Sequence, residues 1–480
     1  MAEPETDRQL AAGSKQASLR MWDVVSLMVG IVVGVSIFKV PGSVFALTGS
    51  PELALGIWAG GAFLAFCGAL CYAELAAAYP EFGAEYIYLA RAYGRRCAFL
   101  FAWLNVCAVL PGNIGAASFV FAGYAGQLSP RLAHSPGLVA AGAILALMLL
   151  QFAGMVAGRR VQNILTGTKV IALAAILLCG LLLPAAPAEV RAPPAPLQWN
   201  QIGLALVFVL YAYGGWNDAA TVTPEVRDCR RNVPRALLLG LTLIAGLYLA
   251  LNYSFLRVLG FNAASASEAP AAELMHRALG PAFSTLMSLI VMASALGAIN
   301  GMMFSGCRLL AAVGEDFRLF RGWNYWNRRQ VPVWSLLTIA GISLLLTVLV
   351  GLEAGRGGIG LAAQTVGLAA PDWEKYGGGF NMLVAASAPL FWAFFMLSGV
   401  SLIVLRFRDS RRERPFRTPA YPLPAFVFIV SAGFMLWSSL SYAGLITLLL
   451  LPALVSGLVL AAIQRPLKQE DSSLRTVQTD

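Results

Sequence analysis

The 480-residue chain carries few charges: 12% of its residues are Asp, Glu, Lys or Arg, whereas 58% are hydrophobic. Soluble domains of ordinary composition carry about 25% charged residues. A soluble protein of this length with so few charges would lack the polar side chains needed to cover its surface. The composition therefore indicates an integral membrane protein whose apolar residues face lipid.

Other shortages exclude whole classes of site. The chain has two histidines, which leaves little for a His-based metal centre or a haem, and its seven cysteines include no Cys-x-x-Cys pair. We interpret the cysteines as small apolar residues rather than disulfides or zinc ligands. No phosphate-binding G-x-x-x-x-G-K-[ST] loop, His-Glu-x-x-His motif or nucleophile elbow is present. These absences argue against an enzyme, and we expect neither a cofactor nor a metal.

The net charge of +10 does not indicate a nucleic-acid partner, because the basic residues form short clusters between apolar runs. Residues 1–20 are polar and lack the basic-then-apolar pattern of a cleaved signal peptide. We expect residues 1–20 and 465–480 to be cytoplasmic tails. Between them, the expected partners are membrane lipid and a small-molecule substrate.

A helix needs about 20 apolar residues to cross the hydrocarbon core of a bilayer. Twelve runs are of this kind, which predicts about twelve transmembrane helices. They are Asp23–Thr48, Leu53–Tyr79, Arg96–Gly126, Leu138–Gly158, Val161–Leu183, Gln201–Val226, Pro234–Gly260, Phe283–Val313, Pro332–Gly351, Phe380–Leu405, Pro424–Leu440 and Gly444–Ile463.

The distribution of basic residues sets the orientation. Alternate loops, together with the termini, hold 26 of the 34 Lys and Arg residues, the opposite loops hold 6, and Lys39 and Lys169 lie inside spans. Cytoplasmic loops carry the excess of basic residues in membrane proteins. Both termini are therefore predicted to be cytoplasmic.

The first and sixth predicted spans contain small residues near the middle of the membrane. The first includes Gly30, Gly34 and Ser36, and the sixth includes Gly214 and Gly215 followed by Asn217. Glycine is also common in membrane helices that pack closely, so one such segment alone would be ambiguous. A matched pair of interrupted spans, however, is the best sequence indication of a transporter binding site.

The two interruptions predict a ligand. Free N–H groups at Ser36 and Ile37, at the positive end of a half-helix, suit a carboxylate. Free carbonyls of Val32, Tyr211 and Gly214 suit an ammonium. A site that offers both within a few ångströms fits the backbone of an α-amino acid.

Several short motifs recur in a recognisable order along the chain. They are Gly34-Val35-Ser36-Ile37-Phe38, Cys71-Tyr72-Ala73-Glu74-Leu75, Tyr213-Gly214-Gly215-Trp216-Asn217, Thr223-Pro224-Glu225 with Asn232-Val233-Pro234-Arg235-Ala236, and Asn300-Gly301 with Arg308-Leu309. Together they resemble the L-type amino acid transporter family, within the amino acid–polyamine–organocation superfamily, from about Met21 to Arg417.

The resemblance implies an all-α membrane fold of the leucine-transporter type. Helices 1 and 6 would be discontinuous, and two inverted five-helix repeats would occupy residues 21–185 and 200–405. Two extra C-terminal helices would follow at 420–464. It also implies Na⁺-independent uptake or exchange by alternating access.

The resemblance also assigns site residues. Val35 and Ser36 would hold the substrate carboxylate, and the carbonyls of Val32, Tyr211 and Gly214 would face its amine. The remaining substrate-binding residues would be Gly34, Ile37, Ala212 and Asn217. Trp216 is either an aromatic gate over the substrate, which the resemblance favours, or a packing residue of a membrane helix.

Lys169 resembles the fifth-span lysine of the family. It lies eight residues beyond Val161, or ~12 Å into the membrane at ~1.5 Å per residue. Ionisable residues at such a depth are functional by default, although a lysine in a cavity without a function is the alternative. The resemblance implies that its ammonium replaces the sodium ion of sodium-coupled relatives and supports the first break.

The chain departs from the family pattern at several places. The family usually has Gly where Ser36 stands, and Ser, Thr or Ala where Val35 stands, which predicts a narrower pocket and small substrates. Lys39 either extends to the outer surface or attracts an acidic substrate. The loop Gln127–Gly137 contains no cysteine, so we expect no disulfide-linked heavy chain.

The leading hypothesis is a secondary transporter of small neutral amino acids in the inner membrane of a bacterium, by exchange or proton-coupled uptake. A polyamine or cationic amino acid antiporter would need an acidic group in the pocket, and Glu74 and Asp218 are the nearby candidates. A membrane sensor that binds an amino acid without moving it is the alternative of another class.

Two further features stay open. Glu74, Asp218 and Glu225 are either gate residues that pair with the Arg227–Arg235 cluster or interface residues. The Gly-rich segment 355–379 is either an extracellular loop or a short surface helix.

Overall fold

The computed structural model describes residues 19–81, 83–152, 155–187, 199–327, 331–365, 367 and 369–463, and within them the regular structure is helical, with two isolated β-bridges. The elements are α2 Met21–Val32, η1 Val35–Phe38, α3 Val40–Thr48, α4 Pro51–Ala78, α5 Glu85–Tyr93, α6 Arg95–Leu104, η2 Asn105–Val109, α7 Leu110–Leu128, α8 Pro130–Ala133, α9 Pro136–Phe152, α10 Met155–Leu182, α11 Trp199–Tyr213, η3 Trp216–Glu225, α12 Cys229–Leu259, α13 Phe261–Ala266, α14 Pro270–Leu279, α15 Pro281–Asp316, η4 Arg318–Asn324, α16 Val333–Gly351, α17 Glu353–Thr365, η5 Glu374–Tyr376, α18 Gly379–Arg408, α19 Leu423–Ala443, η6 Gly444–Leu450 and α20 Leu451–Ile463.

Seven helical segments of the described chain are both long and apolar enough to cross a membrane. They are Pro51–Ala78, Arg95–Leu128, Cys229–Leu259, Pro281–Ala311, Val333–Gly351, Gly379–Arg408 and Leu423–Thr447. Shorter apolar helices cover Met21–Val32, Pro136–Phe152, Lys169–Leu182 and Leu451–Ile463. The protein is therefore a multi-pass membrane protein. Of the twelve expected spans, the first and sixth are interrupted, and the twelfth is divided between η6 and α20. The fourth and fifth coincide with α9 and with α10, which is 28 residues long, and residues 153–154 between them lie outside the described part of the chain.

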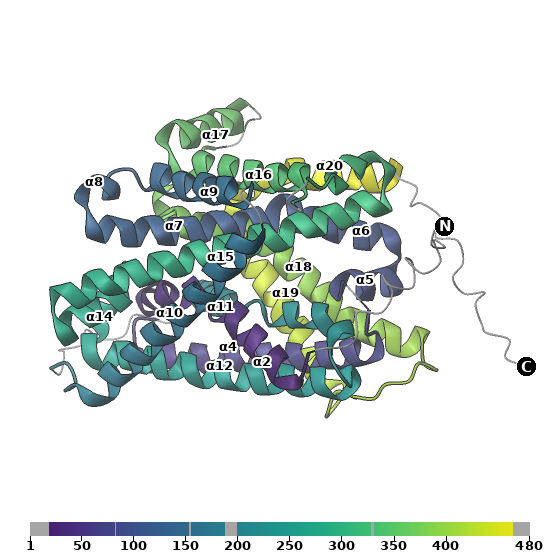
Figure 1. Ribbon diagram of the computed structural model, residues 1–480, viewed down its shortest axis with the longest axis horizontal. Helices are drawn as coiled ribbons and strands as arrows, with labels where there is room; N and C mark the ends of the chain where they lie inside the picture. Colours follow the sequence, from purple (N-terminus) through teal and green to yellow (C-terminus); the bar gives the residue numbers. More distant parts are fainter. Residues whose placement is uncertain are drawn as a thin grey trace, which may run out of the picture.

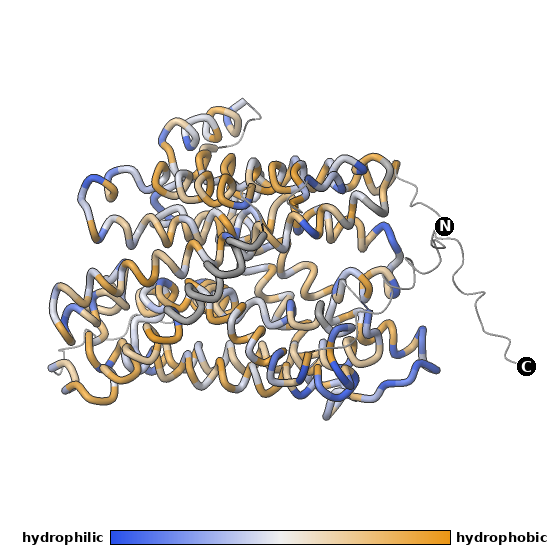
Figure 2. The backbone as a smooth tube through the Cα atoms, viewed as in Figure 1, coloured by the Kyte–Doolittle hydropathy of each residue, from blue (hydrophilic) through white to orange (hydrophobic). Residues whose placement is uncertain are grey.

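The long helices lie side by side along the longest axis of the molecule (Figure 1). Figure 2 shows the most hydrophilic chain gathered at one end of the bundle, at the lower right. An ion pair between Arg230 Nη1, at the start of α12, and Glu413 Oε2, after α18, joins two arginine-rich segments there at 2.8 Å. We call this the arginine-rich end.

A π-helical segment, η2, interrupts the third expected span between α6 and α7. Pro111 follows it at the start of α7. A proline inside a helix removes one N–H and its ring clashes with the carbonyl four residues earlier, so the preceding turn widens. The distortion expected from Pro111 is therefore present, in the form of a π-helical turn.

The Gly-rich segment between α16 and α18 contains the helix α17, which lies along one edge of the bundle (Figure 1). The turn η5 that follows is fixed to the end of α19. Lys375 Nζ donates to the Tyr442 carbonyl at 2.8 Å, and Tyr376 Oη donates to the Ala443 carbonyl at 2.7 Å. Of the two predictions for this segment, the structure thus contains the short helix.

A buried ion pair joins α4 to α18 at the arginine-rich end. Glu74, fully buried on α4, accepts from Arg406 Nε at 2.8 Å and from Arg406 Nη2 at 2.5 Å. The backbone N–H of Thr418 donates to the same carboxylate at 2.7 Å. The hypothesis that Glu74 pairs with the Arg227–Arg235 cluster is wrong, because α18 supplies a cation at bidentate distance.

Replacing Glu74 with alanine should destabilise the protein by on the order of 3 kcal/mol, because Arg406 would keep its charge in a largely buried place without a counter-ion. Thermal unfolding of the purified protein in detergent measures the loss. Glu81→Ala is the matched control: the Glu81–Arg91 pair is partly exposed, and such pairs contribute about 0–1 kcal/mol. Equal losses in both variants would contradict this account.

Candidate functional site

The first predicted break is present in the backbone. α2 ends at Val32, and Gly34 has extended angles of φ −92° and ψ −164°. The 3₁₀ turn η1 begins at Val35, and α3 continues from Val40. The first N–H groups of a helical segment have no acceptor within that segment. The N–H groups of Val35 and Ser36, at the start of this turn, therefore have no acceptor within the turn itself.

The second break lies between α11, which ends at Tyr213, and η3, which begins at Trp216. Gly215 has a φ of +98°, a conformation that favours glycine. A Cβ atom at Gly215 would lie 2.9 Å from Cγ2 of Ile31, in the last turn of α2. The second break therefore packs directly against the end of the first half-helix, and only glycine allows this approach.

Tyr248, on α12, connects the two breaks. Its hydroxyl lies 2.8 Å from the Val32 carbonyl and 3.2 Å from the Ala212 carbonyl. Because a hydroxyl has one proton, it donates to one of the two carbonyls at a time. The sequence analysis missed Tyr248, although a tyrosine in the middle of an apolar span was a usable signal, since its hydroxyl needs a buried partner.

Aromatic side chains hold Tyr248 in place. The ring centroids of Tyr213 and Tyr248 are 5.2 Å apart, and Trp58 on α4 lies 5.7 Å from Tyr248 in an edge arrangement. On the other side of η1, Tyr124 Oη donates to the Phe38 carbonyl at 2.8 Å. Both ends of the first interruption are thus positioned by tyrosines from distant helices.

The predicted carboxylate-binding residues are buried. Val35 is 7% exposed, Ser36 8% and Ile37 0%. The expected amine acceptors are less open, because Val32 accepts from the Gly34 N–H at 2.6 Å as well as lying beside the Tyr248 hydroxyl. An ammonium would have to compete with Tyr248 for this carbonyl.

The carbonyls of the second break also have neighbours. Tyr211 accepts from the Gly214 N–H at 3.1 Å, and Ala212 lies beside the Tyr248 hydroxyl. The Tyr211 ring packs against Phe380 of α18, with centroids 5.8 Å apart. The Tyr211 carbonyl thus belongs to a closed turn rather than to a bare helix end.

Lys169 and Trp216 were predicted to take part in coupling or gating. Lys169 is buried on α10, at 4% exposed, and no ion pair or hydrogen bond within the described part of the chain joins it to the first break. Trp216 is also buried. Its ring packs against Tyr72, at 5.0 Å between centroids, and against Phe395, at 5.7 Å.

Asn217 contacts a residue that the sequence analysis missed. Its Nδ2 donates to Glu85 Oε1 at 2.7 Å, and the same oxygen accepts from Tyr72 Oη at 3.1 Å. Glu85 is 7% exposed, in the first turn of α5. No sequence signal marked it, because a carboxylate between two predicted spans normally faces water.

Lys39 has a partner. Its ammonium forms an ion pair with Glu268, between α13 and α14. Of the two predictions for Lys39, attraction of an acidic substrate finds no support, because a carboxylate of the chain already neutralises this charge. The pair instead connects the start of α3 to the α13–α14 connection.

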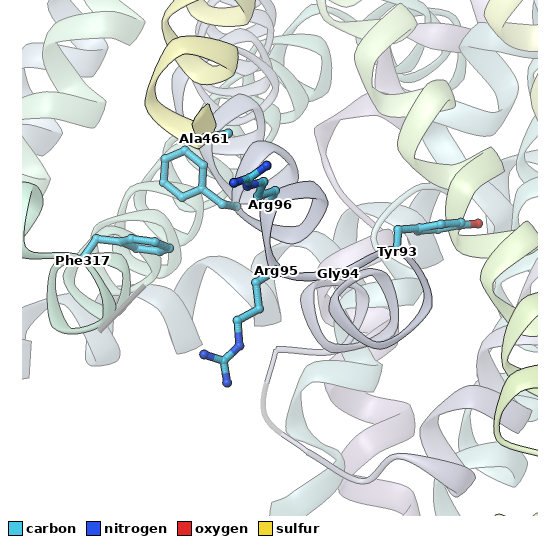
Figure 3. Close-up of a pocket in the computed structure, with 7 residues that line it drawn as sticks. Tyr93, Gly94, Arg95, Arg96, Phe317 and Ala461 are labelled. Atoms are coloured by element: carbon cyan, nitrogen blue, oxygen red, sulfur yellow. The ribbon is translucent and has the colours of Figure 1, made fainter. Parts of the chain in front are cut away.

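A surface crevice of about 360 Å³ lies between residues of α5, α6, the α15–η4 connection and α20 (Figure 3). It is lined by Tyr93, Gly94, Arg95, Arg96, Phe99, Phe317 and Ala461. None of the predicted substrate-binding residues contributes to it. The crevice is therefore a feature separate from the candidate site.

Comparison with known proteins decides the family. The profile of the amino acid permease family matches residues 19–455. The chain belongs to the amino acid permease family. Its resemblance to the L-type transporters is thereby confirmed, and membership makes it a membrane transporter of amino acids rather than an enzyme.

Individual members of the permease family are similar to the chain over most of its length. It is 29% identical to the human b(0,+)-type amino acid transporter 1, over 88% of this chain and 82% of the relative. It is 28% identical to the mouse Asc-type amino acid transporter 1, over 79% and 77%. It is 31% identical to the human large neutral amino acids transporter small subunit 2, over 66% and 62%.

Replacing Tyr248 with phenylalanine in this permease should slow amino acid exchange at least tenfold. The change removes the donor shared by two buried carbonyls, and an unpaired buried group costs about 1–3 kcal/mol. Exchange of labelled alanine in liposomes measures the effect. Tyr253→Phe, on the exposed face of the same helix, is the control and should exchange at the wild-type rate. Normal exchange by Tyr248→Phe would show that the bridge between the breaks has no role in transport.

Proposed function

We propose that the protein is a secondary active transporter of small neutral amino acids that works without sodium, by alternating access. The observation that carries this proposal is the contact between two interrupted helices, with Gly215 against Ile31 and Tyr248 beside carbonyls of both breaks. Irregular backbone inside a membrane is tolerated only where protein or a cavity covers it. The backbone N–H and C=O groups that meet at the two breaks have the chemistry to bind a zwitterion.

In this proposal the N–H groups of Val35 and Ser36 bind the substrate carboxylate. The amine approaches the carbonyls of Val32, Tyr211 and Gly214, displacing the Tyr248 hydroxyl from Val32. Gly34, Ile37, Ala212 and Asn217 complete the pocket. Lys169 supports the first break, and Trp216 moves with η3.

The remaining parts of the proposal concern the surroundings of the site. Residues 21–185 and 200–405 form the two inverted five-helix repeats, and residues 420–464 add two helices. The protein lies in a bacterial inner membrane, with both termini in the cytoplasm and no disulfide-linked partner. The arginine-rich end supports this orientation, because basic residues concentrate on the cytoplasmic side.

Neutral substrates are favoured because the residues of both breaks carry no acidic side chain, and Glu74 is engaged by Arg406. The acidic pair Asp218 and Glu85, both hydrogen-bonded to Asn217, favours a second candidate, a polyamine or cationic amino acid antiporter.

Counterflow in sodium-free liposomes tests the function. Vesicles loaded with unlabelled alanine should accumulate labelled alanine, and external alanine should compete whereas putrescine should not. Counterflow of labelled putrescine into putrescine-loaded vesicles, without counterflow of alanine, would establish the antiporter of cations. Binding of alanine without counterflow would establish a sensor.

Ser36→Gly should widen the pocket, because the Cβ of Ser36 narrows the space in front of η1. We expect leucine and phenylalanine to compete with labelled alanine more strongly in this variant than in wild type. Ser43→Gly, on α3 beyond the break, serves as the control for the same chemical change. If Ser36→Gly gains no larger substrates, Ser36 does not set the size limit.

A further inference from the structure

Glu85 is a buried carboxyl group with neutral partners. It is 7% exposed, and it accepts hydrogen bonds from Tyr72 Oη at 3.1 Å and Asn217 Nδ2 at 2.7 Å. No Lys or Arg among the residues that the structure describes forms an ion pair with it. A buried ionised carboxylate without a cation is costly, and such a group normally takes up a proton instead.

The surroundings of Glu85 contain more acceptors than donors. Asn217 Nδ2 also lies 3.3 Å from Asp218 Oδ1, whereas Asn217 Oδ1 is buried and without a hydrogen-bond partner. An ionised carboxylate only accepts hydrogen bonds, whereas a protonated one also donates. The amide of Asn217 can rotate, so a proton on Glu85 would give Asn217 Oδ1 the donor that it lacks.

Basic groups on the surrounding elements are engaged elsewhere or exposed. On α18, Arg406 binds Glu74, and Arg408 Nη1 donates to the Ala92 carbonyl at 3.3 Å. On α5 itself, Arg91 pairs with Glu81. The other charged or titratable groups near the cluster are Tyr72 on α4, Tyr88 on α5, Asp218 on η3, and the exposed Arg95 and Arg96 on α6.

The cluster joins three elements, and one of them, η3, directly follows the second break. Glu85 belongs to α5, Tyr72 to α4, and Asn217 to η3, directly after the second break. Separation of η3 from α5 would break the Glu85–Asn217 hydrogen bond and expose both groups to water. A carboxyl group in water is ionised at neutral pH.

We propose that Glu85 is a proton-binding site that holds η3 against α5 when protonated and releases it when ionised. This inference rests on the proposed function and adds proton dependence to it. In the packed state the proton sits on a Glu85 oxygen and is donated to Asn217. When η3 separates from α5, the proton of Glu85 passes to water. The carboxylate of Asp218, which is exposed and lies beside Asn217, can accept this proton on the way. When η3 packs against α5 again, Glu85 takes up one proton from water, so one proton is released and one is bound in each cycle.

The sign of the pH dependence follows from burial, which raises the pKa of Glu85 in the packed state. A raised pKa means that the packed arrangement is fully stabilised below the ordinary Glu value of about 4.3 and loses that stabilisation as pH rises through the raised value. Between the ordinary Glu pKa and the raised pKa of packed Glu85, the ratio of separated to packed molecules rises by up to about tenfold per pH unit.

Alanine exchange in liposomes tests the proposal, with the same pH inside and outside at each step from 5 to 8. The wild-type rate should change severalfold across this range. Glu85→Gln, which mimics the protonated group, should exchange at a rate that does not vary with pH and equals the wild-type rate at low pH. Glu81→Gln, a partly exposed carboxylate just before α5, should keep the wild-type profile.

Two outcomes overturn the proposal: a flat wild-type profile, or a Glu85→Gln profile that follows the wild-type one. If Glu85→Gln does not fold, Glu85→Asp keeps a titratable group, and its profile should be shifted along the pH axis; an unshifted profile also overturns the proposal. Absence of exchange by wild type at every pH would instead remove the proposed transport function.

Discussion

The structure depends on one constraint: backbone N–H and C=O groups inside a membrane must find partners within the protein. Two helices of this chain are interrupted, at Gly34 and at Gly214–Gly215. The interruptions face each other, and the Tyr248 hydroxyl lies between the carbonyls of Val32 and Ala212. The two breaks thus bring backbone polar groups of both helices together, and under our proposal these groups bind the two charged ends of an amino acid.

The arginine-rich end uses its acidic residues in two different ways. Glu74 binds Arg406 and the Thr418 N–H, so it connects helices α4 and α18 regardless of pH near neutrality. Among the described residues, Glu85 accepts hydrogen bonds from the neutral Tyr72 and Asn217, and under our proposal its charge depends on whether water reaches it. The first arrangement suits a part of the protein that stays together, and the second suits a part that opens and closes.

Much of the architecture could be predicted from the sequence, because lipid imposes simple rules on length, apolarity and glycine position. The two interruptions and the multi-pass helical fold follow from those rules and from the motifs around Ser36 and Gly214. The first, sixth and twelfth expected spans nonetheless do not form one long α-helix, since apolar runs count residues and do not show where a helix ends.

The side-chain partners could not be predicted in the same way. Tyr248 lies more than 200 residues from Val32, and Arg406 more than 300 from Glu74. Such pairs are set by how helices pack, which local patterns do not encode. Lys39 illustrates this limit, since its partner Glu268 lies in a distant connection.

Binding of matched analogues tests the central claim, that the two breaks together recognise a zwitterion. A ligand that binds the folded protein raises its apparent melting temperature. Alanine should do so, whereas propionate, which lacks the amine, and alaninamide, which lacks the carboxylate, should not. Equal stabilisation by either analogue would contradict recognition of both charged ends by the two interrupted helices.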